Sequence, residues 1–443
     1  MPDLADLPQR LAESAAHLPE PVTAVEDWLA DRRVRCPFRV DRVPFDQLDG
    51  WLFDEETGDL VHRTGRFFAV EGVRIRTNHG TIPEWTQPII HQEDVAILGI
   101  LAKQLDGVLH FLMQAKMEPG NVNTVQVSPT VQATSSNYER AHRGAYSRYV
   151  EYFTEPGMAH VLVDVLQSEQ GSWFRGKRNR NIVVEVTGEV EPHDDFRWLT
   201  LGQLLELLHH PHLINMDART VLSCLPLTDS PAGPVERIEV RNWLTTQKAG
   251  YALTADRLPL NQVREWRRDA VRVFHPSGKY FEVVGARIQA TNREVANWCQ
   301  PLLAPRGTGL AAFVLRDFDG VTKLLARADV RAGYRDVVEV GPTVQCTPAN
   351  YKDRPSPRYL DLVESPEVRV LYDVVQSEEG GRFSSALTRH LLVEAGPEFG
   401  EDLPKGFMWL TADELAGLAR SSYQVDIEAR SLLLCLRAMG KLR

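Results

Sequence analysis

Amides and hydroxyls alternate with apolar residues in QAKMEPGNVNTVQVSPTVQATSSNY (114–138), at an unusual density for this chain. If 125–134 is one continuous strand, alternate side chains share one face, although Pro129 can bend or end the strand. A row of neutral donors and acceptors suits a polyhydroxyl ligand such as a sugar, and a solvent-exposed strand face explains it equally well. The row consists of Gln126, Ser128, Thr130, Gln132 and Thr134.

Two opposite charges lie beside a Pro-Gly pair in the same segment. Lys116 and Glu118 come just before residues 119–120, where a turn is expected. Two such groups on a loop could serve as an acid and a base in proton transfer. Taken alone, a surface ion pair is the better explanation.

A second motif, RGKRNR (175–180), is the most basic stretch of the first part of the chain, and Trp173 and Phe174 precede it. It could clamp a diphosphate while an aromatic ring stacks on a base. A solvated loop is one alternative, and a site for single-stranded nucleic acid is another. The net charge of −10 disfavours nucleic acid. We expect its four cations to stand together at a sheet edge or loop tip, with Arg178 and Arg180 alike and Lys177 different.

Other motifs give no support for a metal or a redox cofactor, and we expect neither. The histidines at 209, 210 and 212 follow an amphipathic segment and are interpreted as the end of a helix rather than a metal site. Phosphate-binding, dinucleotide-binding and zinc-protease signatures are absent from the sequence. The five cysteines are scattered, which suits a reducing cytoplasm. No apolar run of about 18 residues predicts a membrane helix.

These motifs belong to a tandem repeat with a period of about 210 residues. VLQSEQG (165–171) matches VVQSEEG (374–380), and DARTVLSCL (217–225) matches EARSLLLCL (428–436). The Pro- and Gly-rich join between the copies reads as a linker. The predicted organisation is a helical arm (1–24), a first repeat that carries the activity (25–226), a linker (227–236) and a second repeat with a degenerate site (237–443).

The sequence pattern of each repeat predicts mixed α and β structure. Asp106-Gly107 and Asp319-Gly320 separate apolar runs and predict hairpins. Buried strands are expected at 160–169 and 181–186 and at their second-copy equivalents, and helices are expected to begin at Thr200 and Thr411. Helices packed on a mixed sheet, twice over, make an α+β fold.

The two copies differ in their polar residues. Lys116 faces Asp329, and Glu118 faces Arg331. The basic stretch changes as well, since its residues face Ser384, Ala386 and Leu387 in the second copy. This pattern is expected if one copy is catalytic and the other supports its structure. The alternative is neutral drift of exposed loops.

The chain resembles the NDP-hexose 2,3-dehydratase family of deoxysugar biosynthesis in several sequence motifs. These are EPGNVNTVQVSPTVQATSSNY and DVLQSEQGSWFRGKRNRN in the first copy and GPTVQCTPANY and DVVQSEEGGRF in the second. The resemblance covers nearly the whole chain. It implies a cytoplasmic homodimer whose subunits hold two modules similar to the Nudix fold. The Nudix metal-binding signature is missing, which argues against diphosphate hydrolysis. The second copy also departs from the family pattern in RFSSALTRH.

The resemblance implies the elimination of water across carbons 2 and 3 of dTDP-4-keto-6-deoxyglucose, giving a 3,4-diketo-2,6-dideoxy sugar nucleotide without metal or redox cofactor. The unstable product would pass to a 3-ketoreductase or an aminotransferase. A duplicated module that binds the sugar nucleotide without turnover is the alternative. The candidate acids and bases are Glu118, Lys116, Tyr138 and Glu169. The candidate ligand contacts are Trp85, Gln87, Asn121, Asn123, Ser128, Thr130, Gln132, Thr134, Asn137, Trp173, Arg175, Lys177, Arg178 and Arg180.

Overall fold

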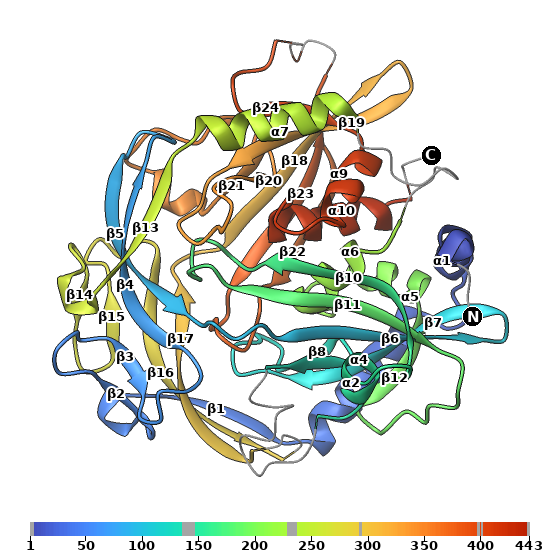
Figure 1. The fold of residues 1–443 in the computed structure, drawn as a ribbon, viewed down its shortest axis with the longest axis horizontal. Helices are drawn as coiled ribbons and strands as arrows, with labels where there is room; N and C mark the ends of the chain where they lie inside the picture. The colour runs from blue at the N-terminus through green and yellow to red at the C-terminus, as the bar shows by residue number, and fades with distance from the viewer. Residues whose placement is uncertain are drawn as a thin grey trace.

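The computed structural model describes residues 4–134, 147–227, 237–291, 295–396, 399 and 402–440. Each half of the chain builds a seven-stranded sheet with the same strand order, and in each sheet one parallel pair lies among antiparallel ones. The α+β fold with mixed sheets and a duplicated unit is therefore confirmed (Figure 1). The expected linker (227–236) lies outside the described residues except for Leu227.

The first large sheet runs in the order β10-β11-β6-β7-β12, and β8 and β9 pair with β7 and β6. The equivalent order in the second sheet is β22-β23-β18-β19-β24, to which β20 and β21 add in the same way. The bounds in the first sheet are β6 (Ile97–Leu105), β7 (Val108–Met117), β8 (Val125–Ser128), β9 (Val131–Ala133), β10 (His160–Ser168), β11 (Arg178–Val186) and β12 (Phe196–Thr200). Those in the second are β18 (Gly309–Phe318), β19 (Val321–Asp329), β20 (Glu339–Gly341), β21 (Val344–Cys346), β22 (Arg369–Ser377), β23 (Leu387–Glu394) and β24 (Phe407–Leu410).

The predicted turns and caps are present. Asp106 and Gly107 take positive φ between β6 and β7, as the hairpin requires, and Asp319 and Gly320 do the same between β18 and β19. Thr200 and Thr411 each form a capping box at the start of α5 and α9. The helices are α1 (Leu7–Ala16), α2 (Val22–Arg35), α4 (Glu151–Thr154), α5 (Leu201–Leu207), α6 (Met216–Ser223), α7 (Ile238–Gly250), α8 (Leu360–Val363), α9 (Ala412–Ala419) and α10 (Ile427–Ala438).

Two smaller sheets exchange strands between the halves. One contains β1 (Phe38–Val43) from the first half and β14 (Arg267–Arg268), β15 (Arg272–Phe274), β16 (Phe281–Ala290) and β17 (Asn297–Pro305) from the second. The other contains β13 (Leu253–Leu258) from the second half and β2 (Trp51–Phe53), β3 (Leu60–His62), β4 (Ala69–Thr77) and β5 (Glu84–His91) from the first. In Figure 1 β13 runs along β4, and β1 runs along β16.

Glycines permit the closest approaches in this exchange. A Cβ on Gly72 would lie 2.6 Å from the carbonyl oxygen of Leu258, and one on Gly285 would lie 2.6 Å from that of Val43. These equivalent glycines sit in register at the exchanged strands β13 and β1. The exchange fastens each half to the other by backbone hydrogen bonds rather than by side chains alone.

A second pair of backbone contacts fixes the turn that follows Glu118. The N–H of Gly120 donates to the carbonyl of Gly380 at 2.7 Å, and the carbonyl of Gly120 accepts from the N–H of Ser385 at 2.8 Å. A Cβ on Gly120 would lie 1.6 Å from the carbonyl oxygen of Phe383. The loop 380–385 of the second half therefore holds the first-half turn beside Glu118.

Gly120→Ala is expected to lower the free energy of unfolding by about 3 kcal/mol, because the added methyl group overlaps a backbone oxygen that cannot move alone. It should also lower activity, since the turn beside Glu118 must shift. Urea unfolding followed by circular dichroism measures the first effect. Gly188→Ala is the matched control, because a Cβ there meets no atom within 4 Å. Equal stabilities for the two variants would contradict the close contact at Gly120.

Candidate active site

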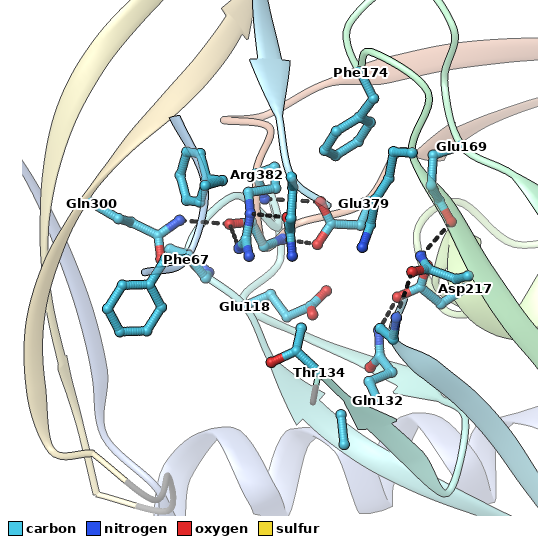
Figure 2. A pocket seen from close by; sticks show the side chains of 18 of the residues that line it. Phe67, Glu118, Gln132, Thr134, Glu169, Phe174, Asp217, Gln300, Glu379 and Arg382 are labelled. Carbon is cyan, nitrogen blue, oxygen red and sulfur yellow. Dashed lines mark hydrogen bonds between the residues drawn. The ribbon is translucent and has the colours of Figure 1, made fainter. Parts of the chain in front are cut away.

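A cavity of about 430 Å³ lies between the first large sheet and the strands that the second half contributes (Figure 2). The first half supplies side chains from the ends of β7 and β9, from the loop between β10 and β11, and from α6. The second half supplies β17 and the loop after β22. The polar and aromatic residues that line it include Trp51, Phe67, Gln92, Lys116, Glu118, Gln132, Thr134, Glu169, Lys177, Asn179, Asp217, Trp298, Gln300, Glu379 and Arg382.

Glu118 is the carboxylate at the middle of the cavity (Figure 2). Its Oε1 lies 3.6 Å from Lys116 Nζ, and the two side chains are 6% and 8% exposed. Its Oε2 is buried and has no hydrogen-bond partner among the described residues. Glu118 thus lies beside a cation and has a buried oxygen that is available to a proton.

Glu169 and Asp217 form a second acidic group. Asn179 Nδ2 donates to Glu169 Oε1 at 2.6 Å, and the amide of Gln132 donates to the Asp217 carboxyl group. Burial raises the pKa of Glu169, although the charges of nearby cations oppose this. Burial, followed by the charge of Glu169, raises the pKa of Asp217 well above its usual value. Such carboxyl groups can hold a proton near neutral pH and donate it.

Arg382 and Glu379 bring a cation and a further acid from the second half. Glu379 accepts the backbone N–H groups of Gly381 at 2.7 Å and of Arg382 at 2.9 Å, which fixes the loop. Arg382 Nε lies 3.2 Å from the Gln92 side-chain oxygen, and its guanidinium carbon is 4.4 Å from the centre of the Phe68 ring. Burial, and then the neighbouring Glu118, raises the pKa of Glu379 to about 7.

The aromatic residues lie at the other end of the cavity. Figure 2 places Phe67 and Gln300 opposite Glu169, Asp217 and Gln132, with the Glu118 side chain between them. Trp298 lines the same end and donates to Gln300 Oε1 at 2.9 Å, while Trp51 donates to the carbonyl of Cys299 at 2.8 Å. The cavity is therefore apolar and aromatic at one end and rich in acids at the other.

The structure splits the predicted polar row at Pro129. Gln132 and Thr134 line the cavity, whereas Ser128 and Thr130 are buried in the protein core. Thr130 Oγ1 accepts from the N–H of Leu101. The residues before and after Pro129 pair with different strands, because β8 pairs with β7 and β9 pairs with β6. The strand ends before Pro129, which is the alternative that the sequence left open, so one continuous polar face does not form.

Several other predicted contacts lie elsewhere. Asn121 Nδ2 donates to the carbonyl of Thr124, and Asn123 Nδ2 donates to that of His212, so both amides brace loops. Gln126 Nε2 donates to Ser377 Oγ at 2.9 Å, away from the cavity wall. Two further candidates, Asn137 and Tyr138, lie outside the described residues.

The four cations of the basic stretch do not stand together. Lys177 lines the cavity, and burial lowers its pKa to about 8. Arg175 Nε lies 2.7 Å from a Glu71 oxygen, and Arg180 Nη2 lies 2.6 Å from an Asp164 oxygen. Arg178 also lies outside the residues that line the cavity. The expectation of one cluster is wrong, because Arg175 and Arg180 pair with different carboxylates and Lys177 is the one member of the four that lines the cavity.

Trp85, Gln87 and Trp173 are not among the residues that line this cavity, but their second-copy equivalents are. These equivalents are Trp298, Gln300 and Arg382. Strand exchange explains the difference, because it carries β17 and the loop after β22 over the first half. The cavity is therefore not built by the first copy alone. The alignment of the two repeats identifies these three positions, but it does not show that they line a cavity of the first half. That assignment requires the strand exchange.

The equivalent positions of the second sheet are filled by ion pairs. Asp329 lies 2.9 Å from Arg327 and 2.5 Å from Arg331. Although burial opposes ionisation, these two cations hold the pKa of Asp329 at about 2. Tyr334, which replaces Asn121, contacts both Asp329 and Asp426 through its hydroxyl group. The charges there neutralise one another, whereas Glu118 faces open space.

The histidines near the end of α5 do not converge on one point. His209 Nε2 lies 3.3 Å from the carbonyl of Ala438, and His212 Nδ1 lies 3.1 Å from Ser377 Oγ. Both therefore contact the second half. Within the described part of the chain, no group of three or more His, Cys, Asp or Glu side chains is arranged to hold a metal ion.

Comparison with known proteins links both halves to one family. The family model described as NDP-hexose 2,3-dehydratase matches residues 22–225 and 237–436. Three relatives bear the name dTDP-4-dehydro-6-deoxy-alpha-D-glucopyranose 2,3-dehydratase. The one from Saccharopolyspora spinosa is 48% identical over 95% of this chain and 92% of its own length. The one from Amycolatopsis orientalis is 46% identical over 98% and 95%, and the one from Streptomyces violaceoruber is 47% identical over 93% and 96%.

Similarity to a solved structure is much weaker. A crystal structure of an ADP compounds hydrolase matches 35% of this chain and 84% of its own, with 15% identity and a TM-score of 0.24. That score is too low to assign a fold, so the Nudix likeness of each module stays a prediction. None of the described helices is both long and apolar enough to cross a membrane.

Proposed function

Because the chain belongs to the NDP-hexose 2,3-dehydratase family, we propose that the cavity is the place where it eliminates water from dTDP-4-keto-6-deoxyglucose. The enzyme is a carbon-oxygen lyase. The observation that carries this assignment of the site is the buried Lys116–Glu118 pair, whose carboxylate has one oxygen without a hydrogen bond among the described residues.

The substrate determines the order of the chemistry. The ketone at carbon 4 acidifies the proton on carbon 3, and a base that removes it leaves an enolate oxygen on carbon 4. The enolate then re-forms the ketone, and its electrons form the double bond between carbons 2 and 3. At the same time the hydroxyl on carbon 2 takes a proton and leaves as water. The resulting enol becomes the 3-ketone. One base, one acid and donors near the enolate oxygen are sufficient, and no electron carrier is consumed.

Glu118 is the proposed base and Glu169 the proposed acid. The Lys116 ammonium group lies beside the Glu118 carboxyl group, which has one oxygen without a hydrogen bond among the described residues. Burial raises the pKa of Glu169, which suits that carboxyl group to donate a proton. The proposed donors to the enolate oxygen are the Gln132 amide, the Thr134 hydroxyl group and the Lys116 ammonium group.

The polarity of the cavity sets the proposed orientation of the substrate. The hexose lies at the acidic end, near Glu118 and Glu169. The thymidine lies at the aromatic end, against Trp298 and Phe67, where a base can stack on a ring. The diphosphate between them is bound by Arg382 and Lys177, rather than by the whole basic stretch.

Further parts of the proposal rest on the family resemblance. They are a homodimer, a cytoplasmic location, a mechanism without metal or redox cofactor, and transfer of the unstable product to a 3-ketoreductase or an aminotransferase. The second repeat is proposed to have no activity of its own, which the Asp329 ion pairs support.

Incubation with the 4-keto sugar nucleotide in deuterated water tests the function. We expect a net loss of about 17 mass units, because water leaves and one deuterium enters carbon 2 as the enol becomes the ketone. Mass spectrometry and proton NMR follow both changes. Binding of the sugar nucleotide without product and without exchange at carbon 3 would instead support the non-catalytic binding module.

A further inference from the structure

A fully buried arginine from the second half contacts the segment that carries Glu169. Arg430 lies on α10 and is 0% exposed. Its Nη2 donates to the carbonyl of Ser168 at 2.7 Å, its Nη1 to the carbonyl of Val425 at 2.5 Å, and its Nε to Thr220 Oγ1 at 2.8 Å. No carboxylate of the described residues lies within ion-pair distance of it. Burial of a cation without a paired carboxylate costs free energy of folding, so we expect this arginine to have a specific role.

The acceptor at Ser168 is the residue directly before Glu169. Glu169 is 4% exposed and lines the cavity, so its position depends on the backbone that Arg430 holds. Arg430 also contributes the largest favourable charge near Glu169, which opposes the rise in pKa that burial causes. One side chain therefore supplies both a backbone restraint and a positive potential at this carboxyl group.

The repeat provides a mirror image of this contact. Arg219 on α6 is also 0% exposed, and its Nη2 donates to the carbonyl of Ser377 at 2.9 Å. Ser377 directly precedes Glu378, which is the equivalent of Glu169 but does not line the cavity. Each half thus holds the other half's strand end through one arginine, and only one of the two strand ends leads into the candidate active site.

We propose that Arg430 is a positioning residue for the dehydration, and that it acts on Glu169 through the carbonyl of Ser168. This inference rests on the proposed function of the cavity. It assigns the second repeat a part in the reaction beyond supporting the fold. Arg430 itself does not line the cavity, so it touches no substrate.

The charged and polar groups that surround Glu169 come from several elements. Arg430 lies on α10, and Asp217 lies on α6. Lys177 directly precedes β11, Asn179 lies at its start, and Glu378 and Glu379 follow β22. Arg430 and Lys177 favour the charged form of Glu169, as does the Asn179 hydrogen bond, while the other carboxylates disfavour it.

The pH dependence of turnover distinguishes positioning from a role in folding alone. The first step is to find which limb of the pH–rate profile depends on Glu169. It is the alkaline limb that is missing from the profile of the residual activity of Glu169→Gln. In Arg430→Gln the pKa of Glu169 loses a lowering influence, so this limb should move to higher pH by about one unit. Displacement of the carboxyl group should lower kcat by about a hundredfold, with KM little changed. Arg430→Lys keeps the charge and should restore the position of the limb.

Arg219→Gln is the matched control, because it removes an equally buried arginine with an equivalent set of contacts. It should lower stability to a similar extent without moving the limb. Equal shifts in both variants, or the parent limb in Arg430→Gln, would overturn the proposal. If Arg430→Gln does not fold, Arg430→Lys provides the test. The lysine keeps the charge but lacks some of the guanidinium donors that hold the backbone, so a kcat equal to that of the parent would refute the positioning role. A parent protein that shows no turnover would refute the proposed function instead.

Discussion

Glu118→Gln is expected to lower kcat by a factor of about 10²–10⁴, the usual contribution of a general base. The amide has nearly the same shape as the carboxylate but cannot accept the proton from carbon 3. Exchange of that proton with deuterated water should disappear together with product formation. Because the substrate still fits, the melting temperature and the affinity for dTDP should change little.

Two comparisons test this role. Glu169→Gln should keep only a small residual rate of elimination while retaining some exchange at carbon 3, since it lacks the acid but retains the base. Arg331→Gln changes the equivalent position of the second half, where the side chain pairs with Asp329, and should keep turnover near the parent rate in protein that folds. Full exchange at carbon 3 in Glu118→Gln would assign the base elsewhere, with Lys116 the next candidate.

Arg382→Ala is expected to weaken dTDP binding roughly ten- to hundredfold. A charge-assisted hydrogen bond to phosphate contributes about 1.5–3 kcal/mol, and each 1.4 kcal/mol corresponds to about a factor of ten. Arg382 lines the cavity between its aromatic and acidic ends, where the proposed diphosphate lies. Calorimetric titration of dTDP into the variant measures the effect directly.

Arg180→Ala is the control for this measurement. Its guanidinium pairs with Asp164 instead of lining the cavity, so the variant should bind dTDP like the parent. Lys177→Met should show a loss in the same direction as Arg382→Ala. If Arg180→Ala binds more weakly than Arg382→Ala, the nucleotide lies along the basic stretch and the proposed orientation is reversed.

The local structure was predictable because short-range physical signals determine it. Asp106-Gly107 needs positive φ in a tight turn, and Thr200 with Gln203 caps a helix, whatever lies around them. The duplication was readable because both copies retain the same apolar pattern and the same strand order. Glu118 was identified as a candidate because the second copy has Arg331 in its place, whereas Glu169 came from the family resemblance, since its second-copy equivalent Glu378 is also acidic.

The origin of the cavity wall was not predictable from the same signals. Trp85 and Trp298 occupy equivalent places on equivalent strands, and nothing in either local sequence states which half they face. That depends on β1 and β13 pairing across the repeat, which is a long-range choice between two strands of similar pattern. The same limit applies to Glu379, whose loop belongs to the second half but lines the cavity beside the first large sheet.

The exchange of β1 and β13 also constrains how the chain can fold as it leaves the ribosome. Domains of a growing chain commonly fold in order from the N-terminus. Here β4 can pair with β3 and β5, but it lacks β13 along one edge until Leu258 has emerged, and β1 must wait for Ala290. Until then the nascent first repeat carries unpaired strand edges, which are templates for pairing with other chains. The same pairing that joins the halves in the finished enzyme therefore makes translation of the second repeat a condition for completing the small sheets, although the first large sheet takes all its strands from the first half.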